Sequence, residues 1–158
     1  MTLIIDAAPL VALGDRRDPL HRAVLRTLES ESGDLVVPAP VSAEIDYLLR
    51  SRGGRDAARR FVRDVADGRL QVEGLSREEH GTVLDLDRRY DDLDVGLADL
   101  SVVVLAHRFH TRRLLTFDER HFRTLRPVLG GAFTLLPADG APGWRPRPRA
   151  GPAPPSTR

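Results

Sequence analysis

Cysteine and lysine are both absent from the 158 residues, and each absence excludes a class of chemistry. Without cysteine the chain has no disulfide, no thiolate nucleophile and no thiolate metal ligand, so a bound metal must be held by oxygen or imidazole. Without lysine, every mechanism that needs a side-chain amine is excluded. All 24 basic side chains are arginines, and we expect arginine to make any contacts to phosphate.

Aromatic residues and long apolar runs are also scarce. The chain has one Trp, two Tyr and five Phe, which do not cluster as an RNA-stacking platform would. No apolar run approaches the roughly 20 residues that a membrane-spanning helix needs. The N-terminus lacks the basic segment and long apolar stretch of a signal peptide. We therefore expect a protein without membrane segments that stays in the cytoplasm.

Charge and composition divide the chain near residue 137. Residues 138–158 hold four arginines and one acid, which leaves 20 basic and 22 acidic side chains, a net charge of −2, in residues 1–137. This tail is rich in proline and glycine and has too little apolar surface to offset the entropy of ordering it. We expect one folded domain over 1–137 and a disordered tail over 138–158. The tail is either a dispensable extension or a charged arm that assists binding.

Short β-rich runs alternate with segments of helical spacing. Glycines and helix caps mark their ends, including a capping box from Ser76 to Glu79. This alternation predicts an α/β fold, a three-layer sandwich with a central, mainly parallel sheet flanked by helices. The run at 112–117 is expected to be a central strand and the run at 132–136 an edge strand. Expected strands cover 2–5, 35–38, 69–72, 112–117 and 132–136, and expected helices cover 18–28, 40–54, 55–68, 76–90 and 96–109.

Two of the expected strands lead directly to an aspartate. Asp6 follows the first strand and Asp118 follows the strand at 112–117. In parallel α/β sheets the functional site lies beyond the carboxyl ends of the strands, so carboxylates at neighbouring strand ends would share one crevice. Each aspartate could equally cap the helix that follows it, and that alternative stays open.

Two further acids occupy unusual positions. Asp99 lies within "GLADLSVVVLAHRF", a helix that is apolar on nearly all sides, where a charged carboxylate is costly unless it is compensated. Glu44 lies near the start of the helix that follows the strand at 35–38, where a solvated acid is an equally good interpretation. Together with Asp6 and Asp118 they would place up to four negative charges in one pocket.

A divalent cation would relieve that repulsion. Hard oxygen ligands in a chain without cysteine point to Mg²⁺ or Mn²⁺. Such an ion lowers the pKa of bound water and neutralises charge developing on a phosphodiester. The four acids therefore suggest hydrolysis of a nucleic-acid backbone.

Four blocks of the sequence, in this order and spacing, resemble PIN-domain proteins, specifically the VapC-type toxins of bacterial toxin–antitoxin pairs. The resemblance covers residues 2–137. It implies the PIN fold, a Mg²⁺- or Mn²⁺-dependent ribonuclease site at Asp6, Glu44, Asp99 and Asp118, an RNA substrate, a homodimer and a cognate antitoxin. The blocks are "LIIDAAPLVAL", "VVPAPVSAEIDYLL", "DLDVGLADLSVVVLA" and "RRLLTFDERHF".

The chain departs from its relatives at one place and is ambiguous at another. Many relatives carry Ser or Thr where this chain has Ala8, whereas Thr116 matches a frequent hydroxyl position and is a candidate for the outer shell of the site. Among Asp91, Asp92 and Asp94, we choose Asp94 as an outer-shell acid. Its alternative, the N-cap of the next helix, stays open.

Other classes of site fit less well. The five histidines form no HExxH pair, and His107 with His110 is expected to end a helix rather than to bind metal. A phosphatase or phosphoacceptor of the haloacid-dehalogenase or receiver type would need a lysine, and the dehalogenase D-x-D is replaced by "DAA". A non-catalytic RNA- or partner-binding module of the same fold is the remaining alternative.

Helical surfaces at 10–28 and 45–61 hold more apolar residues than one small sheet can cover. We expect part of this surface to pair two copies of the chain and part to form a groove for an antitoxin helix. The tail over 138–158 is expected to be dispensable for both contacts.

Overall fold

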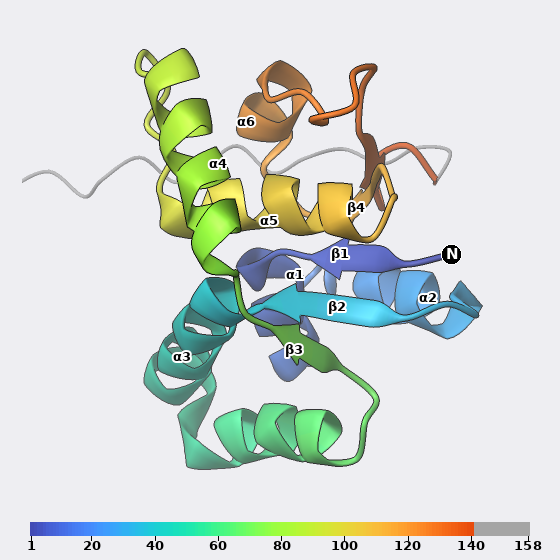
Figure 1. Cartoon of the computed structure of the whole chain (residues 1–158). Coiled ribbons are helices and arrows are strands. Elements are labelled where there is room, and N and C mark those ends of the chain that lie inside the picture. Colours follow the sequence, from blue (N-terminus) through green and yellow to red (C-terminus); the bar gives the residue numbers. More distant parts are fainter. Residues whose placement is uncertain (141–158) are drawn as a thin grey trace, which may run out of the picture.

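The structure is a computed structural model that describes residues 1–140, and strands alternate with helices along this part of the chain (Figure 1). The expected α/β class is thereby confirmed. The strands are β1 (Leu3–Ile5), β2 (Leu35–Pro38), β3 (Gln71–Glu73), β4 (Arg113–Leu115) and β5 (Thr134–Leu136), and the helices are α1 (Ala7–Gly14), α2 (His21–Ser30), α3 (Ala39–Ala66), α4 (Arg77–Arg89), α5 (Leu97–Arg108) and α6 (Glu119–Thr124).

The five strands form a single parallel sheet in the order β3-β2-β1-β4-β5. The central strand is β1, in which Ile4 pairs with Val36 of β2 on one side and Leu114 of β4 on the other. The run at 112–117 is interior, as expected, and β5 is an edge strand. Because β1 and β4 are parallel neighbours, their carboxyl ends meet at the same edge of the sheet.

Helices cover the sheet and bury its apolar strands on both faces. In β1 all three side chains are fully buried, which explains a continuous apolar run instead of an alternating one. Helix α5 packs on β1 and β2 and against α4, while α1 packs against α2 and α3 (Figure 1). No helix within residues 1–140 is both long and apolar enough to cross a membrane.

Helix α3 contains the break that the sequence predicts. The expected helices at 40–54 and 55–68 form one continuous element that kinks at Gly54. Gly54 has a φ of 76°, in the left-handed region that glycine adopts without a Cβ clash. The kink lets the first half of α3 follow β2 directly while the second half turns back toward β3.

The two predicted helix starts differ in outcome. Helix α4 begins with the expected capping box, in which Ser76 accepts from the backbone N–H of Glu79 and the Glu79 carboxylate accepts from that of Ser76. Helix α2, expected from residue 18, begins only at His21. Asp18 instead accepts from the backbone N–H of Leu20 at 2.8 Å, which stabilises a turn ahead of the helix.

Residues 138–140, at the start of the expected tail, contact the rest of the domain. Asp139 pairs with the Arg123 guanidinium at 2.6 Å and accepts from the backbone N–H of Leu135 at 2.8 Å. These contacts attach residues 138–140 to α6 and β5. The rest of the expected disordered tail lies outside the described residues.

Candidate active site

Asp6 lies immediately after β1 and uses both carboxylate oxygens. Oδ1 accepts from the backbone N–H of Ala7 at 2.7 Å, so Asp6 is the N-cap of α1. Oδ2 accepts from the hydroxyl of Thr116 at 2.8 Å. Asp6 therefore caps α1 with one oxygen, while its second oxygen contacts Thr116 at the end of the neighbouring strand β4.

Asp118 lies just beyond β4 and is linked to Asp6 through Thr116. The backbone N–H of Asp118 donates to the Thr116 hydroxyl at 3.0 Å, while the same hydroxyl donates to Asp6. The Thr116 side chain is fully buried, so its position is well defined. Asp118 also caps α6, by accepting from the backbone N–H of His121 at 3.1 Å. Both aspartates thus serve as caps at adjacent strand ends.

Asp99 and Glu44 approach the same edge of the sheet from two helices. Asp99 lies in the first turn of α5, partly buried, and Oδ2 accepts from the backbone N–H of Gly96 at 3.2 Å. Glu44 lies on α3 and is exposed. Residues 100–106 of α5 are buried in the core, which holds Asp99 at the helix start.

The electrostatics show which of these acids interact. Burial is the largest cause that raises the pKa of Asp6, to about 6. The hydrogen bonds from Thr116 and Ala7 lower this pKa, and the negative charges of Asp99 and Glu44 raise it. The charges of Asp99 and Glu44 therefore both act on Asp6. A positive charge placed among them would be stabilised.

Asp94 lies in the loop before α5 and is exposed, as are Asp91 and Asp92. The N-cap of α5 is Gly96, so the alternative interpretation of Asp94 as that cap is wrong. An outer-shell role for Asp94 stays a prediction.

The oxygen donors at this edge suit a hard cation that keeps part of its water shell. They do not form a closed site in which side chains supply all the ligands. In residues 1–140, no three acidic or histidine side chains form a ready ligand set for an ion. Mg²⁺ keeps several of its waters and is commonly held by one or two carboxylates together with substrate phosphates. Asp6 and Asp99 supply only oxygen donors, and burial with like charge raises the free energy of the ionised Asp6. Such an arrangement fits Mg²⁺ or Mn²⁺.

His121 is a neighbour of Asp118 that the sequence reasoning did not select. Its Nδ1 lies 3.0 Å from Oδ2 of Asp118, and only 10% of its side chain is exposed. The i, i+3 spacing of Asp118 and His121 at a helix start is the signal that could have identified the pair. His107 and His110 lie at the end of α5 and just beyond it, as expected.

Comparisons with known proteins found a matching family model and two similar proteins. The PIN domain family model matches residues 3–126. Ribonuclease VapC26 of Mycobacterium tuberculosis is 40% identical over 135 residues, which cover 85% of this chain and 100% of that relative. The crystal structure of Mycobacterium tuberculosis VapC20, described as a sarcin-ricin loop cleaving toxin, matches with a TM-score of 0.66 and 19% identity over 71% of this chain and 86% of that chain. The match to VapC20 establishes similarity of fold.

Proposed function

This chain belongs to the PIN-domain family and is a homologue of VapC ribonuclease toxins, and from that premise we propose that it is a Mg²⁺- or Mn²⁺-dependent endoribonuclease. It acts as the toxin of a toxin–antitoxin pair and hydrolyses RNA in the cytoplasm. One observation carries the proposal. The Asp6 carboxylate, whose pKa is raised by burial, lies within range of the charges of Asp99 and Glu44 and is linked to Asp118 through Thr116.

The side chains divide the work of such a reaction. A bound Mg²⁺ or Mn²⁺ supplies an activated water and neutralises charge developing on the phosphodiester. Asp6 and Asp99 would hold the ion, with Glu44 and Asp118 completing the acidic site. Thr116 keeps Oδ2 of Asp6 in place, and Asp94 is the proposed outer-shell acid. Arginine side chains bind the RNA phosphates, because they are the only basic side chains other than histidine.

Removing divalent cations tests the metal mechanism directly. Purified protein should cleave structured or single-stranded RNA with Mg²⁺ or Mn²⁺, and EDTA should abolish the cleavage. Adding excess Mg²⁺ back should restore it, because the acids retain their positions without the ion. Fragment analysis on denaturing gels measures the rate. Undiminished cleavage in EDTA would contradict the metal mechanism, and no cleavage under any condition would favour a non-catalytic module of this fold.

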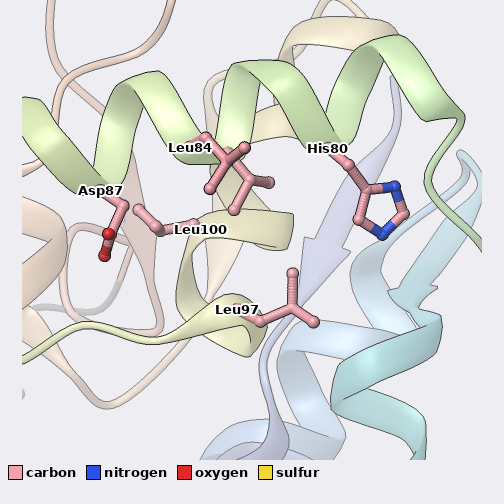
Figure 2. A pocket seen from close by; sticks show the side chains of 6 residues that line it. His80, Leu84, Asp87, Leu97 and Leu100 are labelled. Atoms are coloured by element: carbon pink, nitrogen blue, oxygen red, sulfur yellow. The ribbon is translucent and has the colours of Figure 1, made fainter.

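The chain also presents an apolar groove of about 390 Å³ between α4 and α5. Figure 2 shows Leu84 of α4 and Leu97 of α5 beside this space, with His80 toward one end and Asp87 toward the other. Leu84 is 56% exposed and Leu97 is 48% exposed, and the two lie beside one groove instead of singly on the surface. The expected apolar surfaces at 10–28 and 45–61 did not include this groove.

We propose that a second copy of the chain covers the groove. A two-fold axis would bring the His80 end of one groove onto the Asp87 end of the other, so one patch is complementary to itself. The relatives' classification as toxins supports an additional antitoxin partner. The apolar residues Leu25 and Tyr47, which are 37% and 70% exposed in the surfaces expected from the sequence, remain available for that partner.

Leu84→Glu should turn the dimer into a monomer, because it places a charge in a covered apolar contact. Light scattering at tens of micromolar should give about twice 17.5 kDa for the wild type and 17.5 kDa for the variant. Leu129→Glu, which changes a 65% exposed leucine outside the groove, is the matched control and should stay dimeric. Both variants should still co-purify with the antitoxin. A monomeric wild type, or a dimeric Leu84→Glu variant, would contradict this interface.

A further inference from the structure

The carboxylate of Asp118 is contacted on both oxygens by a single residue, His121. The backbone N–H of His121 donates to Oδ1 at 3.1 Å, and the ring Nδ1 lies 3.0 Å from Oδ2. The ring approach is close, but it lacks the angles of a hydrogen bond, and Nδ1 is buried with no hydrogen-bond partner among the described residues. A buried polar ring atom is therefore aimed at the acidic site without being satisfied by the fold alone.

The helix that carries His121 is anchored by the two residues that follow it. The next residue, Phe122, is 1% exposed and packs edge-on against Phe133, with ring centroids 6.4 Å apart. Arg123 then pairs with both Glu119 and Asp139, which ties α6 to the turn after β5. Two consecutive anchors thus fix the helix that carries His121.

We propose that His121 is a positioning residue that orients the Asp118 carboxylate for the acidic site. This inference rests on the proposed nuclease function. The backbone N–H of His121 donates to one oxygen of Asp118 and the ring nitrogen lies 3.0 Å from the other, so both oxygens of the carboxylate face this one residue. Partners of this kind orient carboxylates that serve metal ions, and their loss typically weakens metal binding by about 10- to 100-fold. His121 itself does not bind the ion.

Two substitutions separate this role from simple packing. His121→Leu keeps a side chain of similar size but has no donor, whereas His121→Asn keeps an amide at the δ position of the ring nitrogen. Calorimetric titration of Mn²⁺ into RNA-free protein should show binding weakened about tenfold or more in His121→Leu, with most of the affinity retained in His121→Asn. Thermal melting in EDTA measures how much fold stability each variant loses. His107→Leu, at an exposed histidine within α5 and outside the site, is the control.

A double-mutant cycle tests whether His121 acts through Asp118. In an Asp118→Asn background, His121→Leu should change the affinity for Mn²⁺ little, because the carboxylate it orients is already gone. Equal Mn²⁺ affinity of wild type and His121→Leu, or an undiminished effect in the Asp118→Asn background, would overturn the proposal. If His121→Leu does not fold, His121→Gln replaces it, because its amide lies one bond beyond the δ position. A wild type that binds no Mn²⁺ would contradict the proposed function as well.

Discussion

Asp6→Asn should reduce RNA cleavage by about a hundredfold to a thousandfold, the range for loss of one electrostatic group in a catalytic site. The substitution keeps the shape of the side chain but removes the charge that would hold a divalent ion. The amide oxygen can still accept from the backbone N–H of Ala7, which preserves the N-cap of α1. The loss of activity should therefore not come from loss of fold.

Cleavage rates at equal protein concentration measure the effect, and growth inhibition on expression gives a second readout. Asp85→Asn is the matched control because the Asp85 side chain is 80% exposed on α4. Replacing Glu44, Asp99 or Asp118 by the corresponding amide should also lower the cleavage rate strongly. Asp94→Asn should lower the rate less. An Asp6→Asn variant that cleaves RNA as fast as wild type would remove Asp6 from the site.

The metal-free protein should be more stable at pH 5 than at pH 7. Asp6 has a pKa of about 6 in the folded protein, against an ordinary value of 3.8. Between these values the folded protein binds more protons than the unfolded chain, so the free energy of unfolding decreases as the pH rises. The full difference between the two pKa values of Asp6 corresponds to at most about 3 kcal/mol in the free energy of unfolding. Roughly 1 kcal/mol of this change falls between pH 5 and pH 7.

Urea unfolding in EDTA at pH 5, 6 and 7 measures this dependence. Asp6→Asn should flatten it and should raise the stability of the metal-free protein at pH 7, because no charge is then buried. The comparison is best kept above pH 5, since Glu79 and Asp139 have lowered pKa values and their stabilising contributions are lost in more acidic solution. Stability that rises from pH 5 to pH 7 in wild type but not in Asp6→Asn would contradict the assignment to Asp6.

Sequence patterns predicted the structure best where the local preference of a segment agrees with its burial in the fold. A continuous apolar run implies a strand buried on both faces, and parallel strands bring their carboxyl ends together. Asp6 and Asp118 could therefore be placed at one edge before any coordinates were considered. The capping box at Ser76 and the break at Gly54 depend on residues within one turn, and the structure confirms both.

Features that depend on distant contacts were not accessible from the sequence. The contact of Asp139 with Arg123 of α6 is one example, because it joins the start of the expected tail to a helix. The packing of Phe122 of α6 on Phe133, just before β5, is another such contact, and it anchors the helix that carries His121. Asp18 at the start of α2 illustrates a local ambiguity, because the same side chain can cap a helix or a turn.

The apolar groove between α4 and α5 was missed for a related reason. Leu84 and Leu97 are separated by a loop in the sequence. Leu84 belongs to an amphipathic helix and Leu97 begins a helix that is apolar on nearly all sides, so neither leucine stands out. Only their relative placement shows that both remain exposed beside one groove. Periodicity identifies the apolar face of a helix, but it does not show whether another element covers that face.

Calorimetric titration of Mn²⁺ into metal-free wild type and Asp6→Asn tests most directly whether these carboxylates hold a divalent ion. The wild type should bind Mn²⁺, and Asp6→Asn should bind it at least about tenfold more weakly, because a ligand charge is lost from a partly buried site. Absence of Mn²⁺ binding by the wild type, or equal affinity of the two proteins, would contradict a metal site built on Asp6.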